Sequence, residues 1–277
     1  MSMVFDCHIH MGERADTKPE FARKMNAAGV NGGIVFSHSP AVFSNKAPTP
    51  GDAVRRIAQV MDFTEGVENL FPFHWIDPLE DGVLEQVDMA VVAGVSGFKV
   101  ICSHHYPQDD RAMKVWEYIA ARKKPILFHS GILYNNGPSA EYNRPGNFEY
   151  LFPIAGLKFA LAHISWPWCD ELVAVFGKSN YLRFEANNPN VAEMYVDLTP
   201  GTPPIYREEA LTKLITVGYV SMPTHMIFGT DASSVFEPER VSRYIEHDNA
   251  IYDKLGVSAE QRDMIFRKNM LAFVGEA

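Results

Sequence analysis

Four histidines and one aspartate lie in or at the ends of four separate apolar, β-rich segments: His8, His10, His129, His163 and Asp231. Imidazole and carboxylate groups together are ligands for a divalent metal of borderline hardness, most simply Zn²⁺, with Mn²⁺, Fe²⁺ or Ni²⁺ as alternatives. Any one of these histidines, taken alone, is more often a hydrogen-bonded core or rim residue. Their joint placement at four strand ends favours a metal site.

The H-x-H pair lies in the first predicted strand, residues 3–10. Alternate residues of a strand share a face, so Asp6, His8 and His10 are predicted to point the same way. The residues between them would face the helices: Phe5, Cys7 and Ile9. We expect the histidine face to be the interior, because two imidazoles buried against apolar helices would lack partners.

The candidate metal ligands lie in a unit that recurs along the sequence. Each unit consists of an apolar run, a loop and a stretch with helical periodicity. The runs are residues 3–10, 32–38, 70–76, 97–102, 125–130, 157–165, 180–186 and 225–232. Such alternation implies parallel strands joined by helices, and eight units in 277 residues predict an α/β fold, a (β/α)8 TIM barrel forming one domain over residues 1–277. Helices at 237–254 and 258–273 would close the outer ring. The alternative, a doubly wound sheet, lacks its glycine-rich phosphate-binding pattern.

The motifs and their order resemble the amidohydrolase superfamily, and within it the amidohydrolase-2 branch of metal-dependent TIM-barrel hydrolases and decarboxylases. The resemblance rests on DCHIH, GFKV at Lys99, FHSG at His129, AHIS at His163, FGTD at Asp231 and FRKNMLAFVG, and runs from Asp6 to about Gly275. It implies that the metal ligands are His8, His10, His129 and Asp231. His163 would be catalytic in one-metal members or a ligand of a second ion in two-metal members.

Lys99, on the fourth predicted strand, decides between one ion and two. In two-metal amidohydrolases a lysine on the fourth strand can be carboxylated and bridge both ions, and His163 then completes the ligand set, whereas in the amidohydrolase-2 branch the lysine need not be carboxylated. The alternative is an ammonium group that pairs with a rim carboxylate or a substrate anion. We favour one ion; metal analysis giving close to two ions per chain would reject that choice.

Three further residues are predicted to contact the substrate. Arg144, in the loop 134–147, could clamp a carboxylate, or be a surface arginine. His74 could point into the barrel mouth, or be a hydrogen-bonded core residue. Glu185, at the end of the predicted strand 180–186, could contact substrate, or pair with Arg183. The loops 134–147 and 187–206 are expected to set specificity.

The predicted function is hydrolysis of a small polar substrate with an amide, lactone or related acyl bond. Asp231 would take the proton of a metal-activated water, and His163 would polarise the carbonyl or donate a proton. One alternative is a metal-dependent, non-oxidative decarboxylase of an aromatic or unsaturated carboxylic acid. Another is a catalytically inactive, metal-stabilised barrel that serves as a binding subunit.

Composition excludes several other classes. The net charge of −9 without a basic cluster argues against a nucleic-acid partner. A membrane span would need an uncharged apolar run of about 18 residues, and none is present in the sequence. With three scattered cysteines and no visible signal peptide, we expect a cytoplasmic enzyme acting on a small molecule, and we expect it to form a homodimer.

Overall fold

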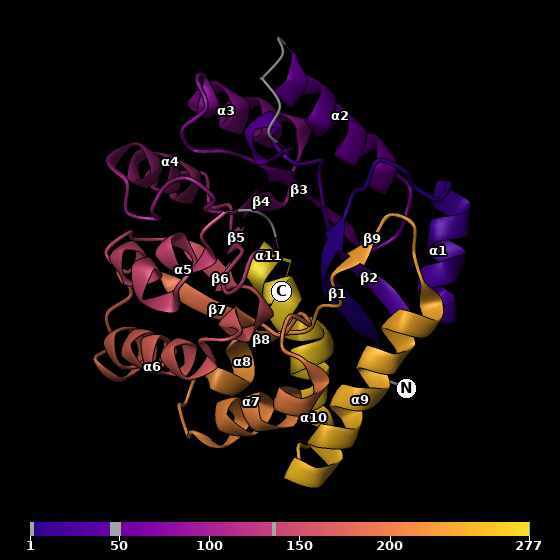
Figure 1. The fold of residues 1–277 in the computed structure, drawn as a ribbon, viewed down its shortest axis with the longest axis vertical. Coiled ribbons are helices and arrows are strands. Elements are labelled where there is room, and N and C mark those ends of the chain that lie inside the picture. The colour runs from indigo at the N-terminus through magenta and orange to yellow at the C-terminus, as the bar shows by residue number, and fades with distance from the viewer. Residues whose placement is uncertain (1–2, 45–50, 135–136, 277) are drawn as a thin grey trace.

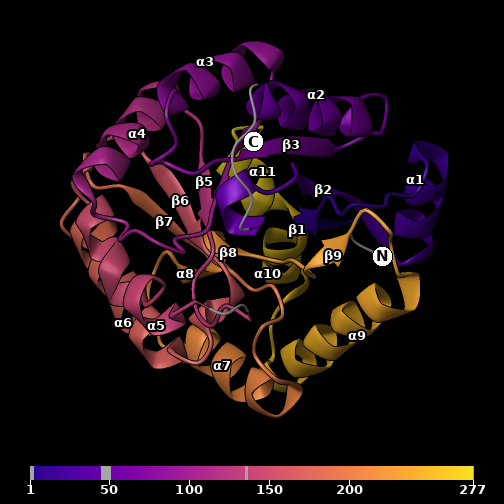
Figure 2. The ribbon, with the colours of Figure 1, turned by 45° about the horizontal axis from the view of Figure 1, so that its top comes forward.

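The computed structural model describes residues 3–44, 51–134 and 137–276, and strands and helices alternate along this part of the chain. Its nine strands are β1 (Val4–His10), β2 (Val30–Phe36), β3 (Leu70–Trp75), β4 (Gly97–Val100), β5 (Ile126–Phe128), β6 (Lys158–Leu161), β7 (Glu193–Asp197), β8 (Met226–Ile227) and β9 (Ala232–Ser233). They pair in the order β8-β7-β6-β5-β4-β3-β2-β1-β9, and every pair is parallel. Figures 1 and 2 show the helices arranged around this curled sheet.

Most of the helices connect successive strands and cover the outer face of the sheet. The α-helices are α1 (Lys18–Ala27), α2 (Asp52–Thr64), α3 (Val83–Ala93), α4 (Asp110–Ala121), α5 (Ser139–Tyr142), α6 (Cys169–Asn180), α7 (Pro204–Thr216), α8 (Met222–His225), α9 (Pro238–Leu255), α10 (Ala259–Asp263) and α11 (Asn269–Val274). Short 3-10 and π-helical segments are η1 (Ala41–Ser44), η2 (Pro145–Leu151), η3 (His163–Ser165), η4 (Tyr181–Glu185) and η5 (Met264–Lys268). No helix among the described residues is both long and apolar enough to span a membrane.

The barrel closes between its last and first strands. The Cys7 backbone N–H donates to the Phe228 carbonyl over 2.8 Å, just after β8, and β9 then pairs with the end of β1. The eighth predicted strand is therefore present as two short pieces, because the chain turns between them at Asp231, whose φ is 55°. The predicted (β/α)8 TIM barrel is confirmed.

Two apolar layers hold the barrel together. The outer layer packs strands against helices, as where the Trp116 ring meets the Phe128 ring edge-on at 5.1 Å. The inner layer fills the barrel and includes Phe73 and Tyr195 from the strands. Phe273 of α11 contacts both of these rings, so α11 plugs the barrel from within (Figure 2). The prediction that residues 258–273 complete the outer ring was wrong for the part that forms α11, while Ile265 and Phe266 before it pack in the outer layer.

Strand β1 departs from simple alternation. Its pairing with β2 shifts register between Asp6 and Ile9, which is the signature of a β-bulge. Phe5 and Cys7 both belong to the inner layer, and the extra residue lets His8, next to Cys7, face inward as well, against the ring of Phe36. The prediction that Phe5 and Cys7 face the helices was wrong, because period-two alternation cannot anticipate an extra residue in a strand.

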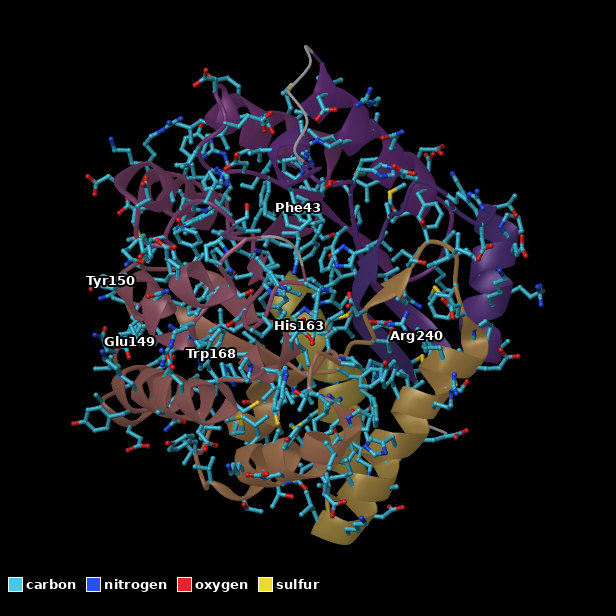
Figure 3. All side chains as sticks on the ribbon, viewed as in Figure 1. Phe43, Glu149, Tyr150, His163, Trp168 and Arg240 are labelled. Atoms are coloured by element: carbon cyan, nitrogen blue, oxygen red, sulfur yellow. The ribbon has the colours of Figure 1, made fainter. Side chains whose placement is uncertain are left out.

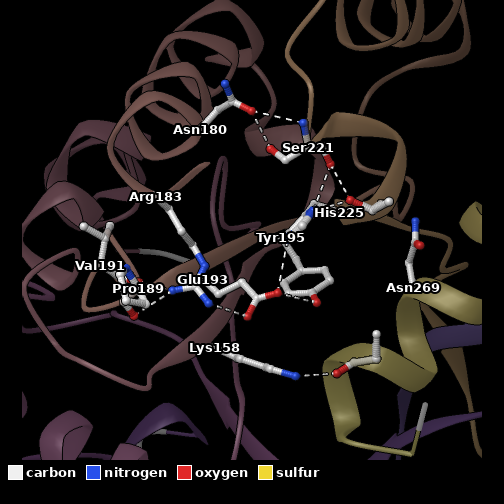
Figure 4. Close-up of polar contacts among 12 residues, drawn as sticks. Lys158, Asn180, Arg183, Pro189, Val191, Glu193, Tyr195, Ser221, His225 and Asn269 are labelled. Carbon is white, nitrogen blue, oxygen red and sulfur yellow. Dashed lines mark hydrogen bonds and ion pairs between the residues drawn. The ribbon is translucent and has the colours of Figure 1, made fainter. Parts of the chain in front are cut away.

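The predicted strand at 180–186 was also wrong. Residues Tyr181–Glu185 continue α6 as a π-helical turn, and the seventh strand is β7, further along the chain. Figure 4 shows how this turn is held: Arg183 donates to the Val191 carbonyl and to Glu193, and Glu193 also pairs with His225. The apolar residues of this turn resemble those of a strand in sequence, but their backbone hydrogen bonds continue the helix.

Candidate metal centre

His8, His10 and Asp231 converge where β1 ends and the chain turns between β8 and β9. Asp231 Oδ1 lies 3.4 Å from His10 Nε2 and 3.8 Å from His8 Nε2. Two ligand atoms that are each about 2 Å from a tetrahedral ion lie about 3.3 Å apart, so these spacings fit a divalent metal. One potential ligand atom from each residue lies within 4.8 Å of the other two, which makes these residues a group able to hold a metal ion.

Asp197 orients His8 for this task. His8 Nδ1 donates to Asp197 Oδ2 over 2.7 Å, and both side chains are buried. Because a carboxylate only accepts, the proton of the neutral ring must lie on Nδ1, so Nε2 carries the lone pair. His8 Nε2 is buried and has no hydrogen-bond partner within the described residues. A carboxylate–histidine pair with a free Nε2 is the arrangement that supports metal ligands in proteins.

His163 reaches the centre through an unusual backbone. His163, Ile164 and Ser165 all have positive φ, 64°, 48° and 54°, which non-glycine residues rarely adopt. The chain thus turns directly after β6, and the His163 ring lies 5.1 Å from the His8 ring. Strained conformations of this kind persist where surrounding structure enforces them, commonly at functional sites. Figure 3 shows His163 near the middle of the barrel face.

The backbone at two glycines packs closely against His163 and His8. A Cβ on Gly201 would lie 2.8 Å from His163 Cβ, and one on Gly229 would lie 3.0 Å from His8 Cβ. Real Cβ contacts essentially never reach the first distance and are rarely as short as the second, so glycine at both positions lets the βα loops pack closely against the two histidines. The loop after β7 therefore contributes to the site by backbone contact. The predicted loop 187–206 was wrong in part, because β7 occupies Glu193–Asp197 within it.

His129, after β5, lies beside this group. Its ring centroid is 4.9 Å from that of His163, and its Nε2 donates to the Ile132 carbonyl over 3.1 Å. Nδ1 is therefore the nitrogen that remains for a metal. His129 lies outside the three-residue group around Asp231, and its role as a ligand stays a prediction.

Burial keeps the imidazoles in the form that binds metals. It lowers the pKa of His8, His10 and His129 well below the usual value, and the charge of Lys99 adds to the effect in each. Burial also lowers the pKa of His163. The rings are consequently neutral at neutral pH, as metal coordination requires.

Lys99 supplies a buried positive charge at the centre. Its side chain is fully buried, and Nζ lies 5.0 Å from the centroid of the Phe36 ring with no hydrogen-bond partner within the described residues. Burial lowers its pKa to about 8, against the opposing effect of the Asp197 and Asp231 carboxylates. The amine is therefore mostly protonated at neutral pH, and within the described residues its Nζ contacts the Phe36 ring without forming a hydrogen bond.

With this geometry in view, comparison with known proteins identifies the family. The model of the amidohydrolase-2 family, whose description is amidohydrolase, matches residues 5–275. The chain belongs to the amidohydrolase-2 family. This assignment agrees with the resemblance seen in the sequence motifs. The comparison with curated proteins gave no match.

Solved structures of other amidohydrolases share the fold. A protein from Pseudomonas putida assigned as a 2-pyrone-4,6-dicarboxylic acid hydrolase is 15% identical, with a TM-score of 0.64 and coverage of 100% of this chain and 98% of that one. Amidohydrolase 2 from Bifidobacterium longum subsp. infantis is 14% identical, with a TM-score of 0.58 and full coverage of both chains. An amidohydrolase from Burkholderia ambifaria with bound Zn is 12% identical, with a TM-score of 0.54 and coverage of 93% and 67%.

The structure does not bring three of the predicted substrate contacts to this amidohydrolase centre. Arg144 is half exposed and pairs with Glu171, 2.5 Å away, so its guanidinium is already engaged at the surface. His74 points outward on β3, where it packs against Phe98 and bonds to Ser37, because its neighbour Phe73 occupies the inner layer.

Glu185 lies at the opposite end of the barrel. It ends the π-helical turn before β7, and its Oε1 accepts from Asn180 Nδ2 over 2.7 Å. The start of a barrel strand is remote from the ends where catalytic side chains gather. The predicted substrate contact was therefore wrong. Of the predicted loop 134–147, residues 135–136 lie outside the described part of the chain.

Sequence reasoning missed Asp197, the partner of His8. The residue ends β7 in the run EMYVD, an apolar segment followed by an acid, which is the same signal that drew attention to Asp231. Because the seventh strand was predicted at 180–186, Asp197 was not recognised as a residue at the end of a strand. Asp6 was noticed but misplaced, since its carboxylate accepts from the Thr230 N–H over 2.9 Å and fixes the turn that carries Asp231.

Proposed function

We propose that this amidohydrolase is a metal-dependent hydrolase that cleaves an amide, lactone or related acyl bond in a small polar substrate. One observation carries the proposal: His8, His10 and Asp231 form a metal-spaced donor group, with Asp197 behind His8. We propose one ion per centre, most simply Zn²⁺, held by this group with His129 Nδ1 as the fourth donor. The chemistry supplied by a bound Zn²⁺ is polarisation of a substrate oxygen and acidification of water.

The chain's own side chains divide the remaining work. Asp231, whose Oδ1 faces both His8 and His10, would accept a proton from the attacking water and return it to the leaving group. His163 lies adjacent to His8, and its Nδ1 donates to the Pro200 carbonyl over 3.3 Å, so the neutral ring would present the lone pair of Nε2 to the substrate. After taking up a proton at Nε2, His163 would donate it to the substrate oxygen. Asp231 and His163 both have a left-handed backbone conformation that the surrounding structure enforces, so their side chains are positioned before the substrate binds.

Lys99 would bind an anionic part of the substrate. A buried ammonium without a partner is unfavourable by itself, and a carboxylate or developing oxyanion would satisfy it. This interpretation supports one ion over two, because a lysine that holds a substrate anion as an ammonium is not a carboxylated bridge. It also supports a substrate with a negative charge near the scissile bond.

The test is an assay of the whole protein with Zn²⁺ or Mn²⁺ against lactones, N-acyl amino acids and aromatic carboxylic acids. Incorporation of ¹⁸O from labelled water into the product is expected. Release of CO₂ without incorporation would instead establish the decarboxylase, which the same buried Lys99 also suits because it can hold a carboxylate. A zinc-bound protein that turns over no substrate of either kind would favour the inactive barrel.

A further inference from the structure

A second cluster of metal-ligating side chains lies at the ends of β3 and β4. Asp77 follows β3, and His104 and His105 follow β4. These strands are neighbours in the sheet, so their loops meet at the same edge. One potential ligand atom from each of the three residues lies within 4.8 Å of the other two. These three side chains are separate from the group formed by His8, His10 and Asp231.

Two of the three potential ligands form an ion pair with each other. His104 Nε2 lies 3.4 Å from Asp77 Oδ2, while His104 Nδ1 is 3.1 Å from Ser103 Oγ. The other carboxylate oxygen, Asp77 Oδ1, accepts from the Leu79 N–H over 3.0 Å. The Nε2–Oδ2 spacing is that of two ligands around one ion of about 2 Å bond length. Supporting contacts on the far side of each ligand are characteristic of metal sites.

His105 gives the independent indication that something is bound here. The side chain is 3% exposed, yet neither of its ring nitrogens has a hydrogen-bond partner within the described residues. A neutral imidazole needs one donor and one acceptor contact, so burial without either is unfavourable. Burial also lowers the pKa of His105 to about 4, so this ring is neutral at neutral pH, whereas the hydrogen bond to Asp77 raises the pKa of His104, whose proton an ion would have to displace.

We propose that Asp77, His104 and His105 bind a second divalent metal ion at the rim of the barrel. Two imidazoles and one carboxylate favour a borderline metal such as Zn²⁺ or Co²⁺, and three protein donors leave a coordination position for water. His104 is partly exposed, so the ion has a route from solvent. The ion would tie the loop after β3 to the loop after β4. A count of two ions per chain would then arise without a two-metal catalytic centre.

The experiment locates the ions directly. Crystals of the whole protein soaked in Zn²⁺ are examined by anomalous scattering at the zinc edge, and metal content is measured in solution by mass spectrometry under native conditions. A peak between Asp77, His104 and His105 is expected. Its absence at saturating Zn²⁺ would overturn the proposal, whatever the occupancy at His8 and His10, so this outcome is distinct from failure of the proposed catalytic site.

Variants separate the two sites in solution. His104→Ala should lose the ion at the rim and retain the ion at the centre. His10→Ala should lose the ion at the centre and retain the ion at the rim. The matched control is His247→Ala, at an exposed histidine of α9, which should bind as much Zn²⁺ as the wild type. Asp77→Asn provides a second variant should His104→Ala fold poorly by circular dichroism. Unchanged stoichiometry in folded forms of both rim variants would contradict the proposal.

Discussion

His8 donates its Nδ1–H to Asp197 Oδ2 over 2.7 Å, a bond that joins the first barrel strand to the seventh. This bond fixes the tautomer of His8 and leaves Nε2 available to a metal. Asp197→Asn retains the size of the side chain but removes its charge. We expect the affinity for Zn²⁺ to fall about 10- to 100-fold, as measured by competition with a chelator.

The matched control for this change is Asp81→Asn, at a fully exposed carboxylate, which should leave the affinity unchanged. Circular dichroism should show that both variants retain the fold. Equal zinc affinities for Asp197→Asn and the wild type would mean that the carboxylate does not support a metal ligand.

Asp231→Asn should separate metal binding from turnover. The amide oxygen can still face His8 and His10, so the protein should keep much of its metal. It cannot accept a proton, so kcat should fall by at least about 100-fold. Metal content and steady-state rates measured on the same preparation test this; a rate near that of the wild type would remove Asp231 from the proton-transfer role.

Gly229→Ala should disturb the centre by contact alone. The added Cβ would lie 2.2 Å from Thr199 Oγ1, 2.9 Å from Cys7 Sγ and 3.0 Å from His8 Cβ. Overpacking of this kind lowers stability by about 1–3 kcal/mol, and it should also weaken Zn²⁺ binding because His8 is displaced. Urea unfolding and zinc titration measure the two effects. Gly12→Ala is the control, since its nearest contact would be 3.4 Å; similar losses in both variants would contradict the explanation.

The barrel and much of its centre could be predicted from sequence because they depend on local patterns. Apolar runs alternating with helical periodicity determine a parallel barrel, and the ends of its strands must meet, which brings His8, His10 and Asp231 together. Features that depend on distant contacts could not be predicted in this way. The bulge that lets Cys7 and His8 both face inward depends on how β1 pairs with β2.

The same limit explains the errors at His74 and Glu185. The direction of His74 depends on which face of β3 packs into the barrel, and Phe73 takes the inner position. For Glu185, apolar content alone did not distinguish a helical turn from a strand. The contacts that hold that turn are made by specific side chains: Arg183 donates to Glu193, ten residues on, and Glu193 in turn pairs with the more distant His225.

Stability should fall in acid because of Glu193. Burial raises the pKa of this carboxyl, but the hydrogen bond to His225 and the charges around it outweigh burial and hold the pKa at about 2, below the ordinary 4.5. A depressed carboxyl pKa stabilises the fold above the unfolded value, and this contribution is lost as the pH falls from about 4.5 toward 2. It amounts to at most about 3 kcal/mol.

Urea unfolding between pH 3 and pH 7 measures this contribution. Glu193→Gln should be less stable than the wild type at pH 7, and the difference should shrink as the pH falls. Glu260→Gln, at an exposed carboxylate of α10, serves as the control. A stability difference between Glu193→Gln and the wild type that stays constant with pH would show that the carboxyl charge does not matter.

Lys99 should give the enzyme a dependence on alkaline pH when the substrate is an anion. Burial lowers the pKa of the ammonium to about 8, so its charge is present below that pH and is lost above it. The KM of an anionic substrate should therefore rise severalfold between about pH 7 and pH 9, while a neutral substrate should show no such rise.

Lys99→Gln tests the origin of this effect and the number of ions together. The variant should lose the pH dependence of KM and still bind Zn²⁺ at His8, His10 and Asp231, because a single ion does not need the lysine. Two results together would instead establish a carboxylated lysine between two ions. The variant would lose a zinc ion from this centre, as located by anomalous scattering, and the wild type depleted of bicarbonate would recover its activity when bicarbonate is added. The measurement at the centre is unaffected by the rim site, since Asp77, His104 and His105 remain intact in the variant.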